Sequence, residues 1–409
     1  MSTRAPFFAL AVAETLSLSG TRLSTIAIPW LVLSTTGSPV LTGLVAMAEM
    51  LPYVVAKALG GPLIDRVGPK RIAIACDAAS VVTVGLVPLL HLLDMLTISI
   101  LLPIVFVMGV LRGPSDAAKQ AMVPDVAELA GVPLERVTGV VSAIERLAST
   151  AGAAGAGALI AMIGPAQALI VNAVTFAAAA AVIGTGIRLP SRISPAHAAG
   201  PVSYGSELLE GWRFLRRDAV LVSIVVMVAI TNLLDQAFHA VLLPVWTKDA
   251  GHGPELLGAM VAAFSGASII GAAIAASIGE RMPRLMIYTV AFLVTGFPRF
   301  LVFAVDAPLT LAFATMAIGG FASGFLNPIL SAVIFERIPK ALVGRVSSMN
   351  AALCWALIPF GGVLGGALIS LTGLSAALLI TGLAYLLVTL LPLARRSFRG
   401  FERRQPAEA

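Results

Sequence analysis

Several ionisable side chains lie inside long apolar stretches of this 409-residue sequence: Glu14, Arg22, Glu49, Arg112, Asp116, Asp235 and His239. Charges in such stretches are costly and mark ion, proton or substrate pathways. A carboxylate in a low-dielectric cavity is protonated more easily than in water, so Glu14, Glu49 and Asp235 are candidates to take up and release a proton. His239 belongs with them because an unperturbed histidine titrates near pH 6.5.

The spacing of these residues predicts which of them share a helix face. Glu14 and Arg22 are two turns apart on one broad face. Arg112 and Asp116 are spaced i, i+4, which allows a pair, and Asp235 with His239 has the spacing of a proton relay.

Each candidate has a structural alternative. Glu14 could form an ion pair with another helix, and Glu49 an inter-helix bond. Arg112 could receive an anionic group of a substrate, or Arg112 and Asp116 could form a self-neutralised pair. His239 lies nearer the end of its apolar stretch and could simply face water.

Other embedded charges favour structural roles. We expect Lys57 to reach the interface by snorkelling and Arg299 to snorkel outward. Glu145 and Arg146 are adjacent, so they should point to different partners. Asp77 is expected to pair with basic residues of the neighbouring loop.

Composition places the chain in a membrane. Hydrophobic residues make up 58% and charged residues only 12%, against about 25% charged residues in soluble domains. The first apolar stretch is too long for a signal peptide and has no cleavage site, so it is expected to stay as a span. Cys76 and Cys354 indicate neither disulfide nor metal framework, and the sequence holds no phosphate-loop or dinucleotide motif. We therefore expect no enzyme, no metal or cofactor, and no nucleic-acid partner.

A helix that crosses a bilayer needs about 20 apolar residues. Twelve such stretches are predicted, at 7–34, 40–63, 71–93, 97–121, 138–162, 166–187, 219–246, 256–278, 284–305, 308–334, 343–370 and 373–394. The long polar connector at 188–218 separates the sixth from the seventh, and Glu207–Arg217 within it has the pattern of a surface amphipathic helix.

Basic residues are distributed unevenly between the connecting segments. If the N-terminus is inside, the inner segments, including Lys119, hold 21 of the 27 lysines and arginines, and the outer loops hold only Lys248. This asymmetry predicts that both termini are cytoplasmic.

The sequence also repeats. Gly109, Gly113 and Asp116 correspond to Gly320, Gly324 and Asn327 at an offset of 211. The repeat predicts two pseudo-symmetric six-helix bundles, 1–187 and 219–394, joined by the 188–218 linker and followed by a basic tail, 395–409. Such parallel repeats bind substrate between the halves. The alternative is chance similarity among helices rich in alanine and glycine.

The connector from Gly60 to Arg71 resembles the loop between helices 2 and 3 of the major facilitator superfamily. Its pattern is G-x-L-x-D-R-x-G-x-K, with Gly61, Asp65, Arg66, Gly68 and Lys70 at the polar and glycine positions. The resemblance implies that Asp65 latches the halves by contacting the helix that begins at Val343, where Arg345 would add a salt bridge. A carboxylate suits a helix N-terminus because it accepts free N–H groups and complements the dipole. The alternative is a loop that only directs topology.

Further motifs narrow the resemblance. Glu14-x-x-Ser17-x-x-Gly20, Met122-Val123-Pro124-Asp125 and Val343-Gly344-Arg345-Val346-Ser347-Ser348 resemble drug:proton antiporters related to macrolide-efflux and enterobactin-export proteins. This implies a central cavity lined by the first, fourth, seventh and tenth helices. Asn327 would be a neutral hydrogen-bonding group there. Phe238 could line an adaptable apolar pocket, with ordinary packing or interfacial anchoring as the alternative. From the sequence, we also expect few polar groups in this cavity.

We therefore predict an all-helical transporter of the cytoplasmic (inner) membrane. It would act as a monomer, export amphipathic drug-like molecules in exchange for protons by alternating access, and contribute to antibiotic resistance. The alternative is a facilitator or proton symporter that imports a small metabolite. A membrane-embedded enzyme or sensor is a third class, but no nucleophile–base set or signalling domain supports it.

Overall fold

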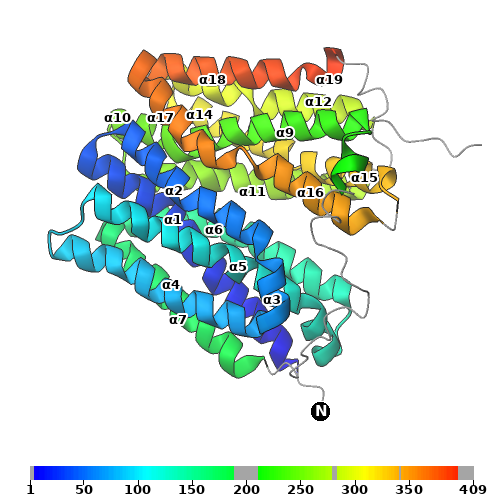
Figure 1. Cartoon of the computed structure of the whole chain (residues 1–409). Helices are drawn as coiled ribbons and strands as arrows, with labels where there is room; N and C mark the ends of the chain where they lie inside the picture. The colour runs from blue at the N-terminus through cyan, green and yellow to red at the C-terminus, as the bar shows by residue number, and fades with distance from the viewer. Residues whose placement is uncertain (1–3, 188–210, 279–282, 340–341, 395–409) are drawn as a thin grey trace, which may run out of the picture.

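The structure, a computed structural model, describes residues 4–187, 211–278, 283–339 and 342–394. All regular secondary structure in these ranges is helical (Figure 1). The first part of the chain forms α1 (Ala5–Thr36), α2 (Pro39–Leu59), α3 (Gly61–Val67), α4 (Pro69–Leu92), α5 (Ile98–Ala130), α6 (Leu134–Ile163) and α7 (Pro165–Gly186). The predicted linker helix falls largely on residues outside the described ranges; within them, 211–215 are helical. The tail at 395–409 also lies outside them.

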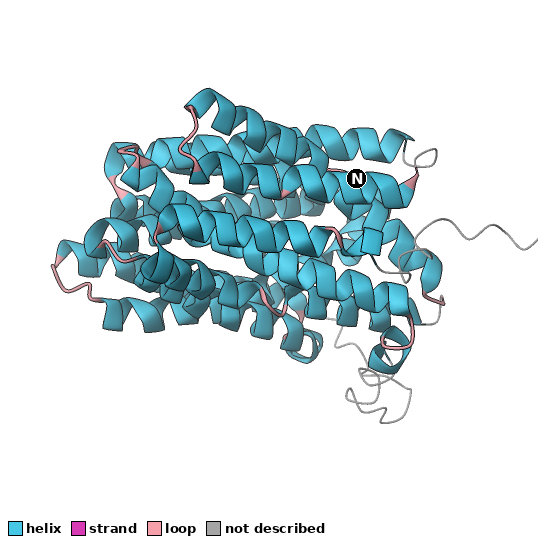
Figure 2. Ribbon diagram, turned by 90° about the horizontal axis from the view of Figure 1, so that it is seen from above, coloured by secondary structure: helices cyan, strands magenta, loops and turns pink. Residues whose placement is uncertain are grey.

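The second part begins with α9 (Ala219–Ala237), which continues through the π-helix η1 (Phe238–Leu242) into α10 (Leu243–Asp249). It then forms α11 (Pro254–Ile278), α12 (Arg284–Thr295), α13 (Phe297–Ala304), α14 (Leu309–Ser323), α15 (Leu326–Arg337), α16 (Val343–Trp355), α17 (Ile358–Thr372), α18 (Leu374–Thr389) and α19 (Leu391–Ala394). The helices run roughly side by side along one direction (Figure 2).

The membrane-spanning prediction agrees with this architecture. Eleven helical segments in the described ranges are long and apolar enough to cross a membrane, and the last predicted span is the shorter apolar helix Leu374–Thr389. Several predicted spans are interrupted, as between α16 and α17, where Pro359 stands in the first turn of the new helix. A proline is tolerated there because its missing N–H has no intrahelical partner in any case.

Two boundaries differ from the sequence prediction. The span predicted at 97–121 continues as α5 to Ala130, past Pro124. The connector expected to be a loop is partly helical, since Gly61–Val67 forms the short helix α3. Gly68 then turns the chain with φ of +96°, a conformation that only glycine adopts readily.

The first and second parts of the chain form a lower and an upper layer in Figure 1. They contact each other mainly where α2 packs against α17 and where α6 packs against α11. A Cβ added at Gly362 would lie 2.8 Å from the Gly43 carbonyl oxygen, and one at Gly258 would lie 2.9 Å from the Gly157 Cα. Glycine is therefore required at both crossings, where the backbones approach closely.

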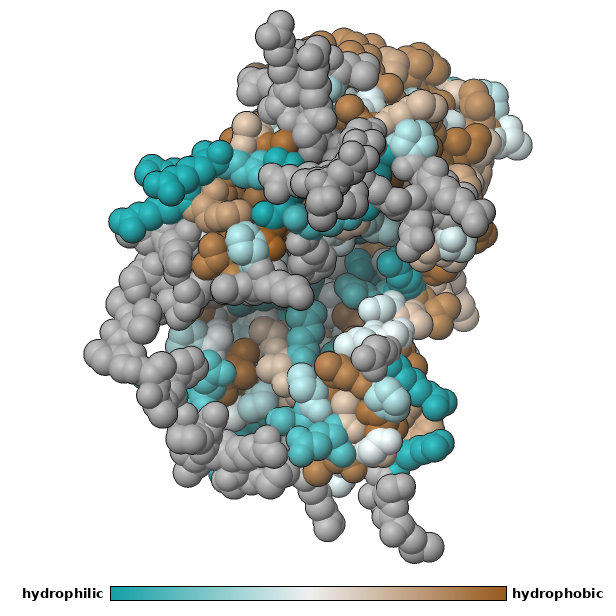
Figure 3. All heavy atoms as spheres, turned by 90° about the vertical axis from the view of Figure 1, so that its right-hand side faces the viewer, coloured by the Kyte–Doolittle hydropathy of each residue, from teal (hydrophilic) through white to brown (hydrophobic). Residues whose placement is uncertain are grey.

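These close crossings lie toward one end of the bundle. The described chain begins and ends at the other end, which we call the terminal end; it lies at the right in Figure 1. Gly43 follows the α1–α2 turn and Gly258 follows the α10–α11 turn, and both turns lie at the opposite end. Seen from the terminal end, hydrophilic atoms are interspersed with apolar ones over the described part of the face (Figure 3).

Candidate transport cavity

A cavity of about 340 Å³ lies between the two parts of the chain. Its walls come from α1, α6, α11 and α15, and the residues that line it are Arg22, Ser142, Glu145, Arg146, Ser149, Phe264, Ser265, Ser268, Ile269 and Asn327. The expectation of a sparsely polar cavity is wrong, because only Phe264 and Ile269 in this lining are apolar. The volume is in the range of sites for small molecules.

Arg22 extends into the cavity from the middle of α1. Its Cβ and Cγ lie 3.4 and 3.5 Å from the position that a Cβ on Gly152 would occupy, so this glycine lets α1 and α6 pack closely beside the arginine. Arg22 is half-buried, and no hydrogen bond or ion pair joins its guanidinium to another described residue. Asn327 of α15 lines the same cavity from the other part of the chain.

Sequence reasoning missed the α6 wall. Glu145 and Arg146 were expected to be structural, but both line the cavity together with Ser142 and Ser149. Their spacing contains the missed signal, since residues at i, i+3, i+4 and i+7 form one face of a helix. A polar face on an otherwise apolar span indicates a surface in contact with water or substrate.

Glu49 of α2 and Arg112 of α5 form an ion pair of 2.8 Å between Oε1 and Nη1. The predicted pairing of Arg112 with Asp116 is therefore replaced by a bond between helices. Asp116 instead accepts a hydrogen bond from the Tyr53 hydroxyl at 3.1 Å, and the Arg112 guanidinium lies 4.5 Å from the centre of the Tyr53 ring. Arg112 and Glu49 line a small cavity of about 10 Å³, separate from the central one.

Lys57 contacts the other part of the chain. Its ammonium lies 5.1 Å from the centre of the Trp355 ring on α16 and donates a hydrogen bond to the Tyr53 hydroxyl at 3.3 Å. The expected snorkelling is thus replaced by a cation–π contact.

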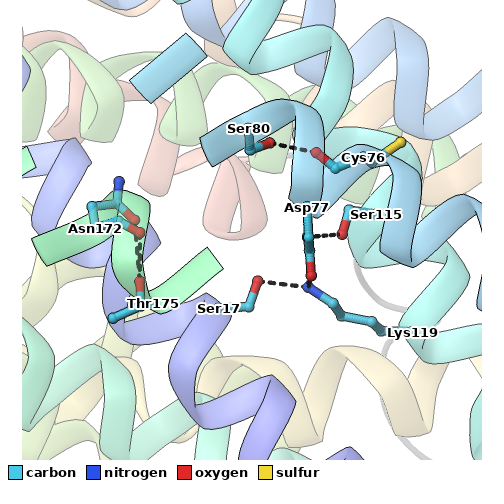
Figure 4. Close-up of polar contacts among 8 residues, drawn as sticks. All are labelled: Ser17, Cys76, Asp77, Ser80, Ser115, Lys119, Asn172 and Thr175. Carbon is cyan, nitrogen blue, oxygen red and sulfur yellow. Dashed lines mark hydrogen bonds and ion pairs between the residues drawn. The ribbon is translucent and has the colours of Figure 1, made fainter. Parts of the chain in front are cut away.

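A fully buried ion pair joins Asp77 of α4 to Lys119 of α5 (Figure 4). The Lys119 ammonium donates to Asp77 Oδ1 at 3.1 Å and to the Ser17 hydroxyl at 2.6 Å, and the Ser115 hydroxyl donates to Asp77 at 2.6 Å. Two expectations are wrong here: Asp77 does not pair with the neighbouring loop, and Lys119 is not a loop charge. The longer α5 explains both, because it places Lys119 inside the bundle.

Glu14 lies one turn before Ser17 on α1 and is buried. The charges of Lys119, Asp116 and Asp77 act on its carboxylate, which forms no hydrogen bond or ion pair with the rest of the described chain. Glu14 therefore neighbours the buried pair and is not itself bonded to it.

Asp235 of α9 pairs with Arg299 of α13. The expectation that Arg299 snorkels outward is wrong, since Arg299 is 1% exposed. Its guanidinium lies 4.9 Å from the Phe238 ring and 5.0 Å from the Phe300 ring. Phe238 is fully buried among these groups, and it is not one of the residues that line the central cavity.

His239 does not bond to Asp235 in the described structure. It lies in η1, where the wider π-helical turn changes the spacing that the i, i+4 argument assumes. Its ring contacts Phe264, a cavity residue, with 6.1 Å between centres. Asp235, with 32% of its side chain exposed, is the more accessible partner of its own ion pair.

The predicted latch residues lie at the terminal end. Gly61 begins α3, Asp65 and Arg66 are exposed, and α3 packs against α2, α4 and α5. The Lys70 ammonium donates to the Gly184 carbonyl oxygen at 2.9 Å. The side chain of Arg345 lies outside the described part of the structure.

Two other ion pairs strengthen this end in the second part of the chain. Arg284 forms two hydrogen bonds with Glu336, of 2.6 and 2.7 Å, and Arg337 contacts Asp218 at 2.8 Å. Asp218 also caps α9 by accepting from the backbone N–H of Val220. Burial opposes ionisation of Asp218, but the hydrogen bonds from Arg337 and the helix N-terminus outweigh it and lower the pKa of this carboxyl.

No cluster of three or more histidine, cysteine, aspartate or glutamate side chains that could hold a metal ion occurs among the described residues.

The family model described as "transmembrane secretion effector" matches residues 3–406. The multidrug efflux pump Tap of Mycobacterium tuberculosis is 30% identical over 386 residues, covering 93% of this chain and 91% of that protein. Macrolide efflux protein A of Streptococcus pyogenes is 21% identical and covers 92% of both chains.

Solved transporter structures share the fold. The nucleoside transporter NupG matches with a TM-score of 0.72 at 14% identity, covering 98% of this chain and 100% of that one. A bacterial homologue of the iron transporter ferroportin in an inward-facing state matches with a TM-score of 0.70 at 14% identity, covering 98% and 100%.

Proposed function

Because this chain belongs to the transmembrane secretion effector family of the major facilitator superfamily, we propose that it exports amphipathic drug-like small molecules from the cytoplasm in exchange for protons. The observation that carries the proposal is the central cavity, to which both parts of the chain contribute and which contains Arg22, Glu145 and Arg146. The relationship to the efflux pumps favours export of small molecules over import. Such a pump would contribute to antibiotic resistance.

Alternating access would move the halves 1–187 and 219–394 as two bundles around the cavity, with the 188–218 linker between them. The close glycine crossings at the opposite end hold the bundles together there. The excess of basic residues at the terminal end favours a cytoplasmic location for both termini in the inner membrane. One chain supplies both bundles, so a monomer suffices.

Proton coupling would use the ion pairs that join neighbouring helices. Protonation of Glu49 or Asp235 would release Arg112 or Arg299 from its partner and leave that arginine free to repack. Glu14 would act beside the Asp77–Lys119 pair, and His239 would act at the cavity wall next to Phe264. In the state with the terminal end closed, Asp65 would latch α3 onto the N-terminus of α16.

The test uses the purified protein in proteoliposomes that contain a pH-sensitive dye. With an imposed proton gradient and a panel of lipophilic cations, lipophilic carboxylates, macrolides and tetracyclines, we expect proton movement only when substrate is added, in the direction opposite to the substrate. Glu49→Gln and Asp235→Asn should each abolish or strongly reduce this exchange. Asp94→Asn is the matched control, because Asp94 is exposed in a turn with φ of +55°, which asparagine also adopts.

The polar lining supports a second candidate, a facilitator or proton symporter for a small metabolite, because such cargo forms many hydrogen bonds. Substrate and protons moving in the same direction would establish symport and reject export. Substrate flux independent of the gradient would indicate a facilitator.

A further inference from the structure

We propose that the central cavity recognises its cargo by an anionic group, such as a carboxylate, which binds the guanidinium of Arg22. This rests on the proposed transport function and names the substrate class of that same site. The cargo would be an amphiphile with one oxyanion, groups that form hydrogen bonds, and an aromatic or aliphatic body.

Other arginines in the interior are paired with carboxylates. Arg112 and Arg299 each have a carboxylate partner on a neighbouring helix, Glu49 and Asp235. Arg22 is half-buried at mid-span and has no ion pair within the described chain. A partly buried guanidinium without a counter-ion loses some of its hydration and gains no ion pair in return, so an anionic ligand would provide the missing partner.

The charged residues that line the cavity also favour an anion. Arg22 and Arg146 are both positive, and Glu145 is the only carboxylate among the described residues of the lining. Glu145 and, more weakly, Asp116 act on Arg22 through their charges, but neither carboxylate forms an ion pair with it; Asp116 accepts from Tyr53 and does not line the cavity. An oxyanion is therefore favoured at this wall over a cation, which would face two positive groups.

The rest of the cavity lining offers hydrogen-bonding groups and a small apolar patch. Serine hydroxyls come from α6 and α11, and the Asn327 amide comes from α15, so hydrogen-bonding groups surround the cargo from both bundles. Phe264 and Ile269 offer an apolar patch on α11. At about 340 Å³ the space suits a compact small molecule.

The test compares three probes that share one dansyl fluorophore and differ only in the end group: a carboxylate, its methyl ester, and a trimethylammonium analogue. Binding is measured by fluorescence titration of the full-length protein in lipid nanodiscs. A charge-assisted hydrogen bond predicts that the carboxylate probe binds roughly 10- to 100-fold more tightly than the ester.

Variants assign this preference to one side chain. Arg22→Gln should remove the preference for the carboxylate over the ester, and Arg22→Lys should retain part of it, because lysine keeps the charge and loses the planar fork. Arg136→Gln is the matched control, since Arg136 is exposed on α6 and does not line the cavity. If Arg22→Gln does not fold, Arg22→Lys in the same titration still tests the assignment through a partial loss.

The outcomes separate this inference from the proposed function. Equal binding of the three probes, a preference for the trimethylammonium probe, or an unchanged preference in Arg22→Gln would overturn the inference, even if proton exchange is observed. Specific carboxylate binding without any proton-coupled flux would leave the inference standing and reject the antiport proposal.

Discussion

Lys248 connects the two parts of the chain at the end opposite the termini. Its ammonium, at the end of α10, donates a 2.6 Å hydrogen bond to the carbonyl oxygen of Leu33, in the last turn of α1. The lysine also places a positive charge at a helix C-terminus, where the dipole favours it. Separation of the bundles at this end would break the contact, so the contact stabilises the closed arrangement of that end.

The perturbation is Lys248→Met, which keeps most of the unbranched side chain and removes its charge and hydrogen-bond donor. A hydrogen bond from a charged group contributes about 1.5–3 kcal/mol. Each 1.4 kcal/mol is about tenfold in an equilibrium constant, so the ratio of open to closed forms at this end should rise by roughly 10- to 150-fold.

The assay is the distance between spin labels at Met95 and Val305, two exposed positions in turns of that end, one in each part of the chain. Both native cysteines are replaced by alanine, and distances are measured by pulsed electron resonance in nanodiscs. Lys248→Met should populate longer distances, and Asp249→Asn, an exposed neighbour, should not. An unchanged or shorter distribution in Lys248→Met would refute the reasoning.

Three further predictions concern stability and packing. Lys119→Met should destabilise the protein by about 3–5 kcal/mol, because it leaves Asp77 buried without its partner. The double variant Lys119→Met/Asp77→Asn should recover most of this loss. Equal losses of stability in the single and double variants, measured by SDS unfolding, would count against this prediction. Because the pKa of Asp218 is lowered, its stabilising contribution is complete above about pH 4 and disappears as pH falls through the folded-state value. The difference in melting temperature between the native protein and Asp218→Asn should therefore shrink on acidification, and a constant difference would contradict it. Gly362→Val should separate α2 from α17 and lower the rate of transport. Gly85→Ala should leave the rate unchanged, because nothing lies within 4 Å of the added Cβ. Equal transport rates in the two variants would reject the packing argument.

The candidate residues show where sequence reasoning stops. The i, i+4 spacing of Arg112 and Asp116 places them on one helix face, but Arg112 forms its ion pair with Glu49 on another helix. Asp235 likewise pairs with Arg299, and its predicted partner His239 lies in a π-helical turn. Spacing along one helix contains no information about which neighbouring helix is opposite, so these partners follow only from packing.

The sequence by itself determined the membrane class, the approximate bounds of the apolar helices, and the superfamily. These properties depend on local hydropathy, on the distribution of lysine and arginine, and on motifs such as that around Asp65, each of which is contiguous in the chain. Only the tertiary structure decided that Lys119 and Asp77 form a buried pair, that Arg299 turns inward, and that the α6 face lines the cavity. The reason is physical: a charge inside a membrane must find a partner or water, and the three-dimensional packing of the helices determines which of the two is within reach.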